Sequence, residues 1–347
     1  MKKILSLLAF PLMLGACERA ETYDKVDNDY MRNFDVAWKL IDENYCFLSY
    51  KEIDWDKVYD EYKPRVENAK DEFEFFDIMS DLVDILRDGH SAILSNFDKH
   101  ASDYKIEYDG TASPKDYISI AAVEEYLTPK LIRATKNNFY YGFIERDGHK
   151  FAYVNYPSFS VNLIGDDLKY VAQCVNEAEG LILDIRNNPG GVGAFGLSFA
   201  GHFFSETTVI GYSARKSGVG HDDFTEPDEL KVVPSSANNW ANKPTILLTN
   251  RGVYSTANIF TCAMRYAPNV TLVGGRSGGG GGLPEMYYLP NGWALAFPSN
   301  VLYDREMQHM ENGFEPDIEV HISKEDSNNG KDTILEKAIE ELLLKME

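Results

Sequence analysis

Hydrophobic residues in the first part of the chain recur every three or four positions, which is the spacing of one buried face of an α-helix. Three such stripes follow one another between residues 30 and 90, and Pro64 is expected to bend or end the second. The stripes consist of Phe34, Trp38, Ile41 and Tyr45, then Val58, Tyr62 and Val66, then Phe75, Met79, Leu82 and Leu86. The pattern predicts a helical N-terminal domain over residues 30–95 with these side chains in its core.

From residue 139 the pattern changes to short apolar runs that alternate with helical segments. This alternation is typical of an α/β fold in which a mostly parallel sheet is buried between helices. We expect strands at 151–156, 180–186, 244–250 and 270–273, and helices at 163–177, 194–204 and 255–266. These elements predict an α/β core over residues 139–325.

Three further segments complete the predicted organisation. Residues 96–138 form a connecting segment with a short helix at 121–128, and residues 213–243 form a long polar loop over the sheet. Residues 326–347 contain a terminal amphipathic helix. Its inner face is expected to carry Leu335, Ala338, Ile339 and Leu342.

The first seventeen residues have the pattern of a bacterial lipoprotein signal peptide. Two lysines precede an apolar run that is too short to span a bilayer, and the run ends in Leu14-Gly15-Ala16-Cys17. Cys17 would then receive lipid and become the mature N-terminus, with residues 18–29 as a polar tether. The alternative is an ordinary secretory signal cleaved near Ala16. We expect a lipid-anchored protein of the bacterial cell envelope, on the periplasmic face or the cell surface.

The net charge narrows the choice of partners. The 347 residues include 34 basic and 55 acidic side chains, a formal net charge of −21, and no run of lysines or arginines. This composition argues against nucleic-acid binding and against electrostatic adhesion to anionic lipid, so membrane contact would occur through the lipid anchor only. Cys46, Cys174 and Cys262 are expected to be buried free thiols, with a single disulfide as the alternative. We find no metal-ligand spacing and expect no cofactor.

Two segments of the predicted core each read as a buried strand, a tight turn and the start of a helix. In the first, Asp184 and Arg186 end the strand and Gly190-Gly191 form the turn; in the second, Ser255 opens the helix. A serine beside fixed N–H donors suits acyl transfer, because negative charge develops on the carbonyl oxygen during attack. The alternatives are an ordinary helix N-cap for Ser255 and a glycine turn that binds no ligand.

A serine nucleophile needs a neighbouring base, and histidine is the usual one. His90 follows Asp88-Gly89 at the end of the third helical stripe and is the candidate base. A single histidine is more often structural than catalytic, and six others compete for the role. These are His100, His149, His202, His221, His309 and His321.

The glycine-rich run at 274–282 resembles a phosphate loop only superficially, because it lacks the Gly-Lys-Ser/Thr ending that cradles phosphate. A close-packed wall of a peptide cleft is the better interpretation. A turn between two strands follows at 289–293, and the polar segment 308–320 contains Glu311.

Together these segments resemble the family of C-terminal processing (tail-specific) peptidases, which also contains the tricorn core protease and the interphotoreceptor retinoid-binding protein. The resemblance rests on four stretches in order: Asp-Gly-His at 88–90, Asp-Ile-Arg-Asn-Asn-Pro-Gly-Gly at 184–191, Tyr-Ser-Thr-Ala-Asn-Ile-Phe at 254–260, and Gly-Phe-Glu-Pro-Asp-Ile-Glu-Val at 313–320. It implies a mostly parallel sheet core of the ClpP/crotonase-like type. Processing members of the family also carry a PDZ domain, but residues 91–138 are too few for a complete one, so specificity for chain ends is not implied.

The family uses two catalytic designs. In the Ser–Lys design the lysine position falls on Gly280, and no lysine occurs between Lys243 and Lys324, so this design is excluded. The tricorn-like design uses serine, histidine and a carboxylate, which the resemblance places at Ser255, His90 and Glu311. The alternative for Glu311 is a solvated loop carboxylate.

The tricorn-like arrangement also has a serine immediately before the histidine. This chain has Gly89 there, so that role is lost or passes to Ser91. Glu311 is expected to set the tautomer of His90 or to hold a bridging group.

The resulting expectation is a serine endopeptidase that acts on peptide or protein substrates. Its oxyanion hole would consist of the N–H groups of Gly190, Gly191 and Thr256, and the helical domain would deliver His90 to the core. Two alternatives stay open: a non-catalytic lipoprotein that binds peptides or an apolar ligand, and an esterase or amidase that uses the same site.

Overall fold

The computed structural model describes residues 26–102, 120–130 and 132–347. The predicted signal peptide, Cys17 and most of the tether lie outside the described residues. Within the described ranges, no helix combines the length and the apolar character that crossing a membrane requires.

Three helices form the N-terminal part of the molecule, as the hydrophobic stripes predicted. They are α1 (Tyr30–Asn44), α2 (Trp55–Glu67) and α3 (Glu72–Asp84). Each begins after an aspartate whose carboxylate accepts N–H groups of the first turn. Helix α2 runs through Pro64 and ends three residues later, so the proline lies in its last turn.

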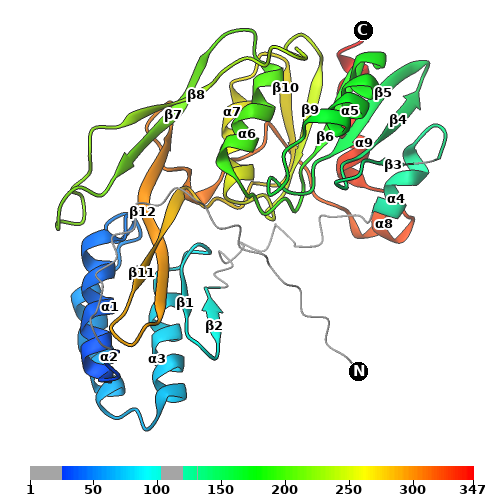
Figure 1. The fold of residues 1–347 in the computed structure, drawn as a ribbon. Coiled ribbons are helices and arrows are strands. Elements are labelled where there is room, and N and C mark those ends of the chain that lie inside the picture. The colour runs from blue at the N-terminus through cyan, green and yellow to red at the C-terminus, as the bar shows by residue number, and fades with distance from the viewer. Residues whose placement is uncertain (1–25, 103–119, 131) are drawn as a thin grey trace.

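A hairpin from much later in the chain completes this helical unit. Its strands are β11 (Gly282–Tyr288) and β12 (Ala294–Asp304), which flank the predicted turn. Leu295, Phe297 and Val301 belong to the same buried cluster as the helices. The helical unit is therefore not a continuous segment as predicted, because most of the hairpin's buried side chains pack with it (Figure 1). Leu302, near the end of β12, packs with the core instead.

The hairpin belongs to an antiparallel sheet with the strand order β2-β1-β12-β7-β8, in which β11 pairs with the other edge of β12. The remaining strands are β1 (Ala92–Leu94), β2 (Lys99–Ala101), β7 (Thr208–Arg215) and β8 (Asp228–Val232). Strands β7 and β8 correct the prediction of a loop at 213–243. Several of their side chains are exposed, so the apolar alternation that marks a strand is weak there.

A second sheet has the order β13-β10-β9-β6-β5-β4-β3. Its strands are β3 (Arg133–Ala134), β4 (Tyr140–Arg146), β5 (His149–Asn155), β6 (Gly180–Asp184), β9 (Thr245–Thr249), β10 (Val270–Gly274) and β13 (Ile318–Glu319). Strands β5, β6, β9, β10 and β13 run parallel, while β4 and β3 form an antiparallel edge. The predicted mostly parallel α/β core is confirmed.

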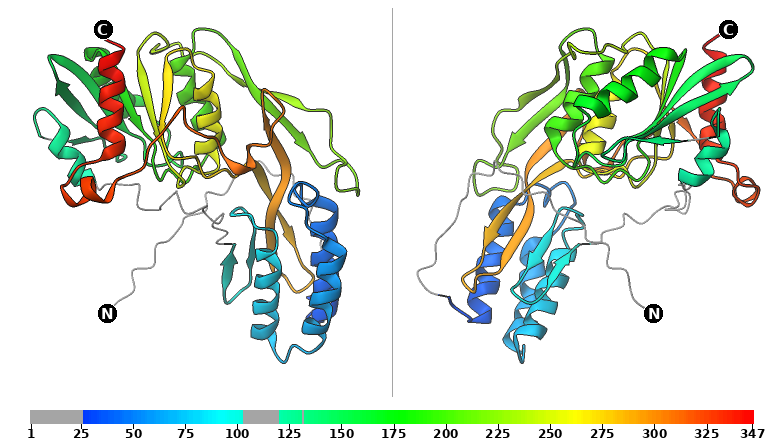
Figure 2. Two further views of the ribbon diagram at one scale, coloured as in Figure 1. Left: turned by 180° about the vertical axis from the view of Figure 1, so that it is seen from behind. Right: turned by 45° about the vertical axis from the view of Figure 1, so that its right-hand side comes forward.

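Helices cover both faces of this second sheet (Figure 2). On one face lie α5 (Gly165–Glu177), α6 (Gly193–Ala200) and α7 (Thr256–Arg265); on the other lie α4 (Ile120–Val123) and α9 (Thr333–Leu344), with α8 (Lys324–Asn328) leading into α9. Short 3₁₀ helices occur at Glu124–Tyr126, Gly201–Phe203 and Met310–Asn312. The predicted inner face of α9 is buried, so the terminal amphipathic helix is confirmed.

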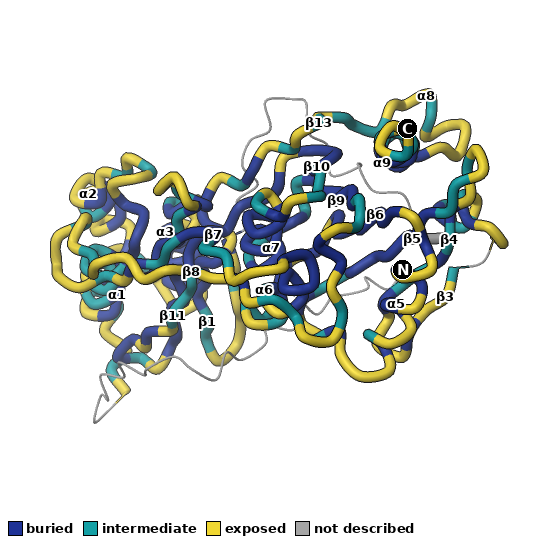
Figure 3. Tube along the Cα trace, turned by 90° about the horizontal axis from the view of Figure 1, so that it is seen from above, coloured by how far each residue is buried: buried dark blue, intermediate teal, exposed yellow. Residues whose placement is uncertain are grey.

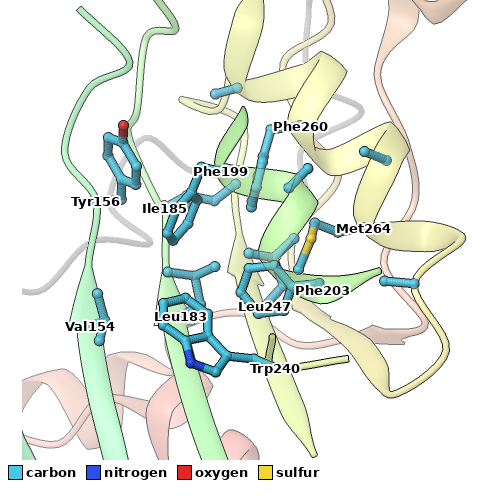
Figure 4. Packing of buried hydrophobic residues seen from close by; sticks show 14 of the residues in the cluster. Val154, Tyr156, Leu183, Ile185, Phe199, Phe203, Trp240, Leu247, Phe260 and Met264 are labelled. Atoms are coloured by element: carbon cyan, nitrogen blue, oxygen red, sulfur yellow. The ribbon is translucent and has the colours of Figure 1, made fainter. Parts of the chain in front are cut away.

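The core beneath α6 and α7 is rich in aromatic side chains. Figure 4 shows Phe199 of α6 and Phe260 of α7 above Leu183 and Leu247 of the sheet. Seen from above, β5, β6, β9 and α7 are largely buried (Figure 3). This packing gives the turns at the ends of β6 and β9 a rigid base. Cys46, Cys174 and Cys262 are buried free thiols, as expected.

Candidate active site

Ser255 lies in a sharp turn between strand β9 and helix α7. Its backbone has φ 57° and ψ −125°, a left-handed conformation that L-residues rarely adopt. Such a conformation costs on the order of 1–3 kcal/mol and persists where surrounding structure enforces it. Here the Ser255 N–H donates to the carbonyl oxygen of Gly279 at 2.9 Å. The turn therefore presents the hydroxyl at the edge of the sheet.

The hydroxyl of Ser255 contacts the imidazole of His90. The distance between Ser255 Oγ and His90 Nε2 is 2.9 Å, although the two residues are 165 positions apart in the chain. His90 comes from the loop between α3 and β1, on the helical unit, whereas Ser255 belongs to the core. Ser255 occupies the N-cap position of α7, but its side chain makes no capping hydrogen bond, so the ordinary N-cap interpretation is wrong.

The backbone N–H groups of Gly191 and Thr256 are two of the predicted oxyanion donors. The N–H groups of Gly191 and Thr256 donate to no other described residue, and the Thr256 hydroxyl donates to the Gly191 carbonyl at 2.7 Å, so the two donors are held side by side. Thr256 also begins helix α7, whose N-terminus favours negative charge. The arrangement suits a developing oxyanion.

Gly190 does not complete this pair, which corrects the prediction at this residue. Its N–H donates to the side-chain oxygen of Asn188 at 2.9 Å and is already in use. Gly190 has a different role: a Cβ atom there would lie 2.8 Å from Ser255 Cβ and 2.6 Å from the Tyr254 carbonyl oxygen. Only glycine lets the first turn approach the nucleophile this closely.

Two hydrogen bonds fasten the two turns to each other. Asn187 N–H donates to Asn250 Oδ1 at 2.9 Å, and the Tyr254 N–H donates to the Asn188 carbonyl at 3.1 Å. Below them, the Arg186 side chain makes two hydrogen bonds with the Asp184 carboxylate, which braces the end of this strand.

Arg186 also reaches beyond its own strand. Its guanidinium forms an ion pair at 2.8 Å with Asp332, the residue that caps helix α9. All three charged groups of this cluster are buried, so the brace ties the Gly190 turn to the C-terminal helix.

The glycine run at 274–282 threads between the nucleophile and the segment of Glu311. Gly279 accepts the Ser255 N–H, and a Cβ atom at Gly279 would lie 1.8 Å from the Glu311 carbonyl oxygen. The N–H of Gly280 donates to that same carbonyl oxygen at 3.1 Å. The run is thus close-packed backbone beside the site, as its interpretation as a wall predicted.

The Glu311 side chain is 5% exposed, so it is not a solvated loop carboxylate. One carboxylate oxygen accepts the Gly281 N–H at 2.9 Å, and the other lies 2.7 Å from Lys51 Nζ. The carboxylate therefore contacts the Gly281 N–H and the Lys51 ammonium, and not the His90 imidazole. Glu311 was predicted either to set the tautomer of His90 or to hold a bridging group. The structure does not show the direct contact with the imidazole that the first of these roles requires.

The loop of His90 is held by a second buried carboxylate, that of Asp88. One oxygen accepts the His90 N–H at 2.9 Å, and the other accepts the Tyr45 hydroxyl at 2.9 Å and lies 3.4 Å from Lys51 Nζ. Ser91 is buried, and among the described residues its hydroxyl has no hydrogen-bond partner, so it does not take over the bridging role.

Tyr254 explains why residue 89 is a glycine. Its ring lies 4.9 Å from the imidazole of His90, centroid to centroid. A Cβ atom at Gly89 would lie 3.0 Å from the Tyr254 hydroxyl oxygen, so the phenol fills the space in which a serine side chain would begin. The absence of a serine at residue 89 therefore goes together with the packing of the Tyr254 ring beside His90.

Comparison with known proteins places this geometry in a family. The model of peptidase family S41 matches residues 150–320, and that of the tricorn protease C1 domain matches residues 26–84. The crystal structure of a protein from Parabacteroides merdae, provisionally named a peptidase, is 38% identical in sequence, with a TM-score of 0.82 over 91% of this chain and 98% of that chain. The chain belongs to peptidase family S41.

Curated relatives of this S41 chain come from both branches of the predicted resemblance. The carboxyl-terminal-processing protease of Synechocystis is 28% identical over 152 residues, which cover 44% of this chain and 33% of the relative. The tricorn protease of Thermoplasma volcanium is 23% identical over 400 residues, covering 93% of this chain and 37% of the relative. The chain spans about a third of the length of these two relatives. The predicted family and the class of serine peptidase are confirmed.

The electrostatic environment of the S41 site suits His90 as a base. Burial lowers the pKa of His90 below its usual value; the Asp88 carboxylate opposes this shift, and the Lys51 ammonium adds to it. The imidazole is therefore neutral at pH 7 and able to accept a proton. Burial also raises the pKa of Glu311 to about 7, helped by Asp88 and opposed by Lys51.

A pocket of about 330 Å³ adjoins the dyad and is mixed in polarity. Its lining includes Gly89 and Tyr254, which precede His90 and Ser255 in the chain. Its lining consists of Tyr50, Lys51, Glu52, Arg87, Gly89, Tyr254, Gly278, Glu311 and Asn312. A pocket of this size, lined by residues adjacent to His90 and Ser255 in the chain, can hold a substrate side chain.

Lys51 is the residue of this site that the sequence did not reveal. It lies between α1 and α2 in a stretch of mixed apolar and polar residues without a motif, and nothing local marks this lysine as buried. Two of the competing histidines have partners of their own: His202 stacks on Trp240, and His221 pairs with Asp42. His309 lies closer to the site and stacks on Tyr50, with 3.9 Å between the ring centroids.

Proposed function

We propose that this S41 chain is a serine endopeptidase in which Ser255 attacks a peptide carbonyl while His90 takes the Ser255 proton. The 2.9 Å contact between Ser255 Oγ and His90 Nε2 is the observation that carries the proposal. A neutral histidine within hydrogen-bond reach of a serine hydroxyl is the arrangement that activates this nucleophile.

In the next step the carbonyl oxygen becomes an oxyanion, which the N–H groups of Gly191 and Thr256 bind. Each such donor is typically worth about 3 kcal/mol of barrier. The protonated His90 then gives its proton to the leaving amine, and water repeats the sequence on the acyl-enzyme to release the acid. Both donors are backbone groups, so the oxyanion hole requires no further side chain.

We further propose that the protein is attached to the bacterial cell envelope through lipid on Cys17. The support is the sequence Leu14-Gly15-Ala16-Cys17 after an apolar run. Replacing Cys17 with serine should move the protein from the membrane fraction to the soluble fraction and abolish incorporation of labelled palmitate. Unchanged membrane association in that variant would contradict the anchor.

Hydrolysis of denatured casein tests the peptidase proposal. The variants are Ser255→Ala and, as a matched control, Ser236→Ala, which changes an exposed serine after β8. We expect the first to lose turnover while keeping its melting temperature and the second to retain wild-type turnover. Turnover that survives in Ser255→Ala would refute the assignment of the nucleophile.

The same preparation separates the two alternative functions. An esterase or amidase would hydrolyse p-nitrophenyl esters or simple amides but leave casein and quenched peptides intact. A binding protein would hydrolyse none of these substrates. Either result would replace the endopeptidase proposal.

A further inference from the structure

Lys51 is a buried lysine whose ammonium group lies among oxygen atoms. Its side chain is 9% exposed, and Nζ lies 2.7 Å from Glu311 Oε1, 3.4 Å from Asp88 Oδ2 and 3.0 Å from the Tyr45 hydroxyl. It also donates to the Arg87 carbonyl at 2.8 Å. Burying an ammonium group is unfavourable unless it is paired, so these contacts account for its presence in the interior.

The contacts of Lys51 join the two units of the molecule. Lys51, Asp88 and His90 belong to the helical unit, whereas Glu311 lies in the 3₁₀ helix Met310–Asn312 of the core. Neighbouring contacts reinforce the junction: the Asn312 amide donates to the Tyr50 hydroxyl at 2.8 Å. The segment that carries Lys51 is therefore bound to the segment that carries Glu311 by an ion pair and a hydrogen bond.

From Lys51, one path of contacts leads to the base. Lys51 lies against Asp88 Oδ2, and Asp88 Oδ1 accepts the backbone N–H of His90 at 2.9 Å. The ammonium thus acts on the loop that sets the position of the imidazole.

Another path leads from Lys51 to the nucleophile. Glu311 accepts the N–H groups of Gly280 and Gly281, and Gly279 accepts the N–H of Ser255. Ser255 and His90 also contact each other, so the two paths together form a closed ring of contacts. Lys51 is the residue at which the path to His90 and the path to Ser255 meet.

A cation is required at the junction because two buried carboxylates face each other across it. Burial alone lowers the pKa of Lys51, but attraction to Asp88 and Glu311 outweighs this and raises it above the usual value, so the ammonium stays charged. No side chain at residue 89 can take over this task, because Tyr254 occupies the space beside Gly89.

We infer that Lys51 is a positioning residue for the proposed reaction: its ion pairs with Asp88 and Glu311 hold the helical unit where His90 meets Ser255. The inference rests on the proposed peptidase function. Lys51 touches neither Ser255 nor His90, so it acts through the two carboxylates.

The test compares Lys51→Met and Lys51→Arg with a matched control, Lys57→Met. Lys57 is a lysine of helix α2 whose side chain is 70% exposed and pairs with Glu61. The readouts are kcat and KM on a quenched peptide that the wild type cleaves, together with the melting temperature. We expect kcat of Lys51→Met to fall about 30- to 100-fold, because small misplacements of reacting groups have effects of that order. KM should change less than about threefold, Lys51→Arg should recover part of kcat, and Lys57→Met should match the wild type.

A double-variant cycle with Glu311→Gln supplies a readout that a purely structural role would not move. If Lys51 acts through Glu311, the double variant should lose no more kcat than the worse single variant. Fully multiplicative losses, or a folded Lys51→Met with wild-type kcat, would overturn the inference. If Lys51→Met does not fold, the test is made with Glu311→Gln alone. We expect that variant to lose at least roughly tenfold in kcat.

The two proposals fail in different ways. An inactive wild type refutes the peptidase function, and the inference with it. An active wild type beside a fully active Lys51→Met leaves the peptidase in place and refutes only the role of Lys51.

Discussion

The two halves of the site are built by different means. The nucleophile half is backbone: Ser255 is held by the Gly279 carbonyl, and the turn at Gly190 approaches it so closely that no side chain fits. The histidine half is held by buried charges: Asp88, Lys51 and Glu311 surround the loop of His90.

This difference teaches how each half can fail. A backbone-built half depends on chain geometry and does not titrate, so it should respond to added atoms and not to pH. A charge-built half depends on the protonation of buried groups, so it should respond to pH and to the loss of one partner. The predictions below separate these two kinds of dependence, from the largest effect to the smallest.

The largest loss should follow removal of the base. His90→Ala should lower kcat/KM by about 10³- to 10⁶-fold, because serine and base act as a unit. Peptide hydrolysis and thermal melts check this, with His100→Ala as the control, since His100 pairs with Asp84 near the surface. Comparable turnover in the two variants would exclude His90 as the base.

Adding a methyl group to the backbone-built half should also slow the reaction of Ser255 severely. Gly190→Ala places Cβ 2.8 Å from Ser255 Cβ at φ +93°, so we expect at least a roughly hundredfold slower reaction with a fluorophosphonate probe.

Gly148→Ala is the matched control for Gly190→Ala, because Gly148 has φ +86° but no atom within 4 Å of the added Cβ. It isolates the backbone strain, about 1–2 kcal/mol of unfolding free energy, from the clash. Urea unfolding measures the strain in both variants. Equal labelling rates in the two would show that the close approach at Gly190 is unimportant.

The charge-built half should make kcat/KM depend on pH. Glu311 has a pKa of about 7, so it takes up a proton as the pH falls through that value and its ion pair with Lys51 is lost. Burial lowers the pKa of His90 below its usual value, so His90 takes up a proton at lower pH than Glu311. The charged groups that face them are Asp88 and Lys51, and Tyr45 donates to Asp88.

We therefore expect wild-type kcat/KM to fall about tenfold around pH 7 and to fall again at lower pH, where His90 takes up its proton. Glu311→Gln resembles the protonated state, so it should start at the lower plateau and show only the second step. Stopped assays from pH 5 to pH 9 on wild type and variant measure both limbs. An identical acid limb in the two proteins would remove Glu311 from the account.

The smallest effect should come from the edge of the helical unit. His221 of the loop between β7 and β8 lies 2.7 Å from Asp42 of α1, in a half-exposed pair. His221→Gln should cost less than about 1 kcal/mol of unfolding free energy and leave kcat within about twofold. A larger loss of kcat would mean that this outer contact, and not the junction at Lys51, controls the position of His90.

The same contrast explains how much of the molecule could be predicted from its sequence. The strands and turns that carry Gly191 and Ser255 are local patterns, and periodicity together with the family resemblance located them. His90 and Glu311 were placed by resemblance, and the structure brings His90 to Ser255 while directing Glu311 to Lys51.

What the sequence could not reveal depends on contacts between distant segments. The hairpin 282–304 packs on helices that precede it by some two hundred residues, and strands β7 and β8 lie in a polar stretch. Lys51 looks like any surface lysine until the fold buries it between two carboxylates. Gly190 was assigned as a donor because glycine turns supply N–H groups, but Asn188 takes that N–H.

The most direct test of the central claim is to map a fluorophosphonate adduct by mass spectrometry on the folded protein. The account predicts one adduct per chain, on Ser255, whose formation is lost in His90→Ala, because only a serine activated by a neighbouring base reacts readily. An adduct on another serine, or none on a preparation that hydrolyses peptides, would contradict it.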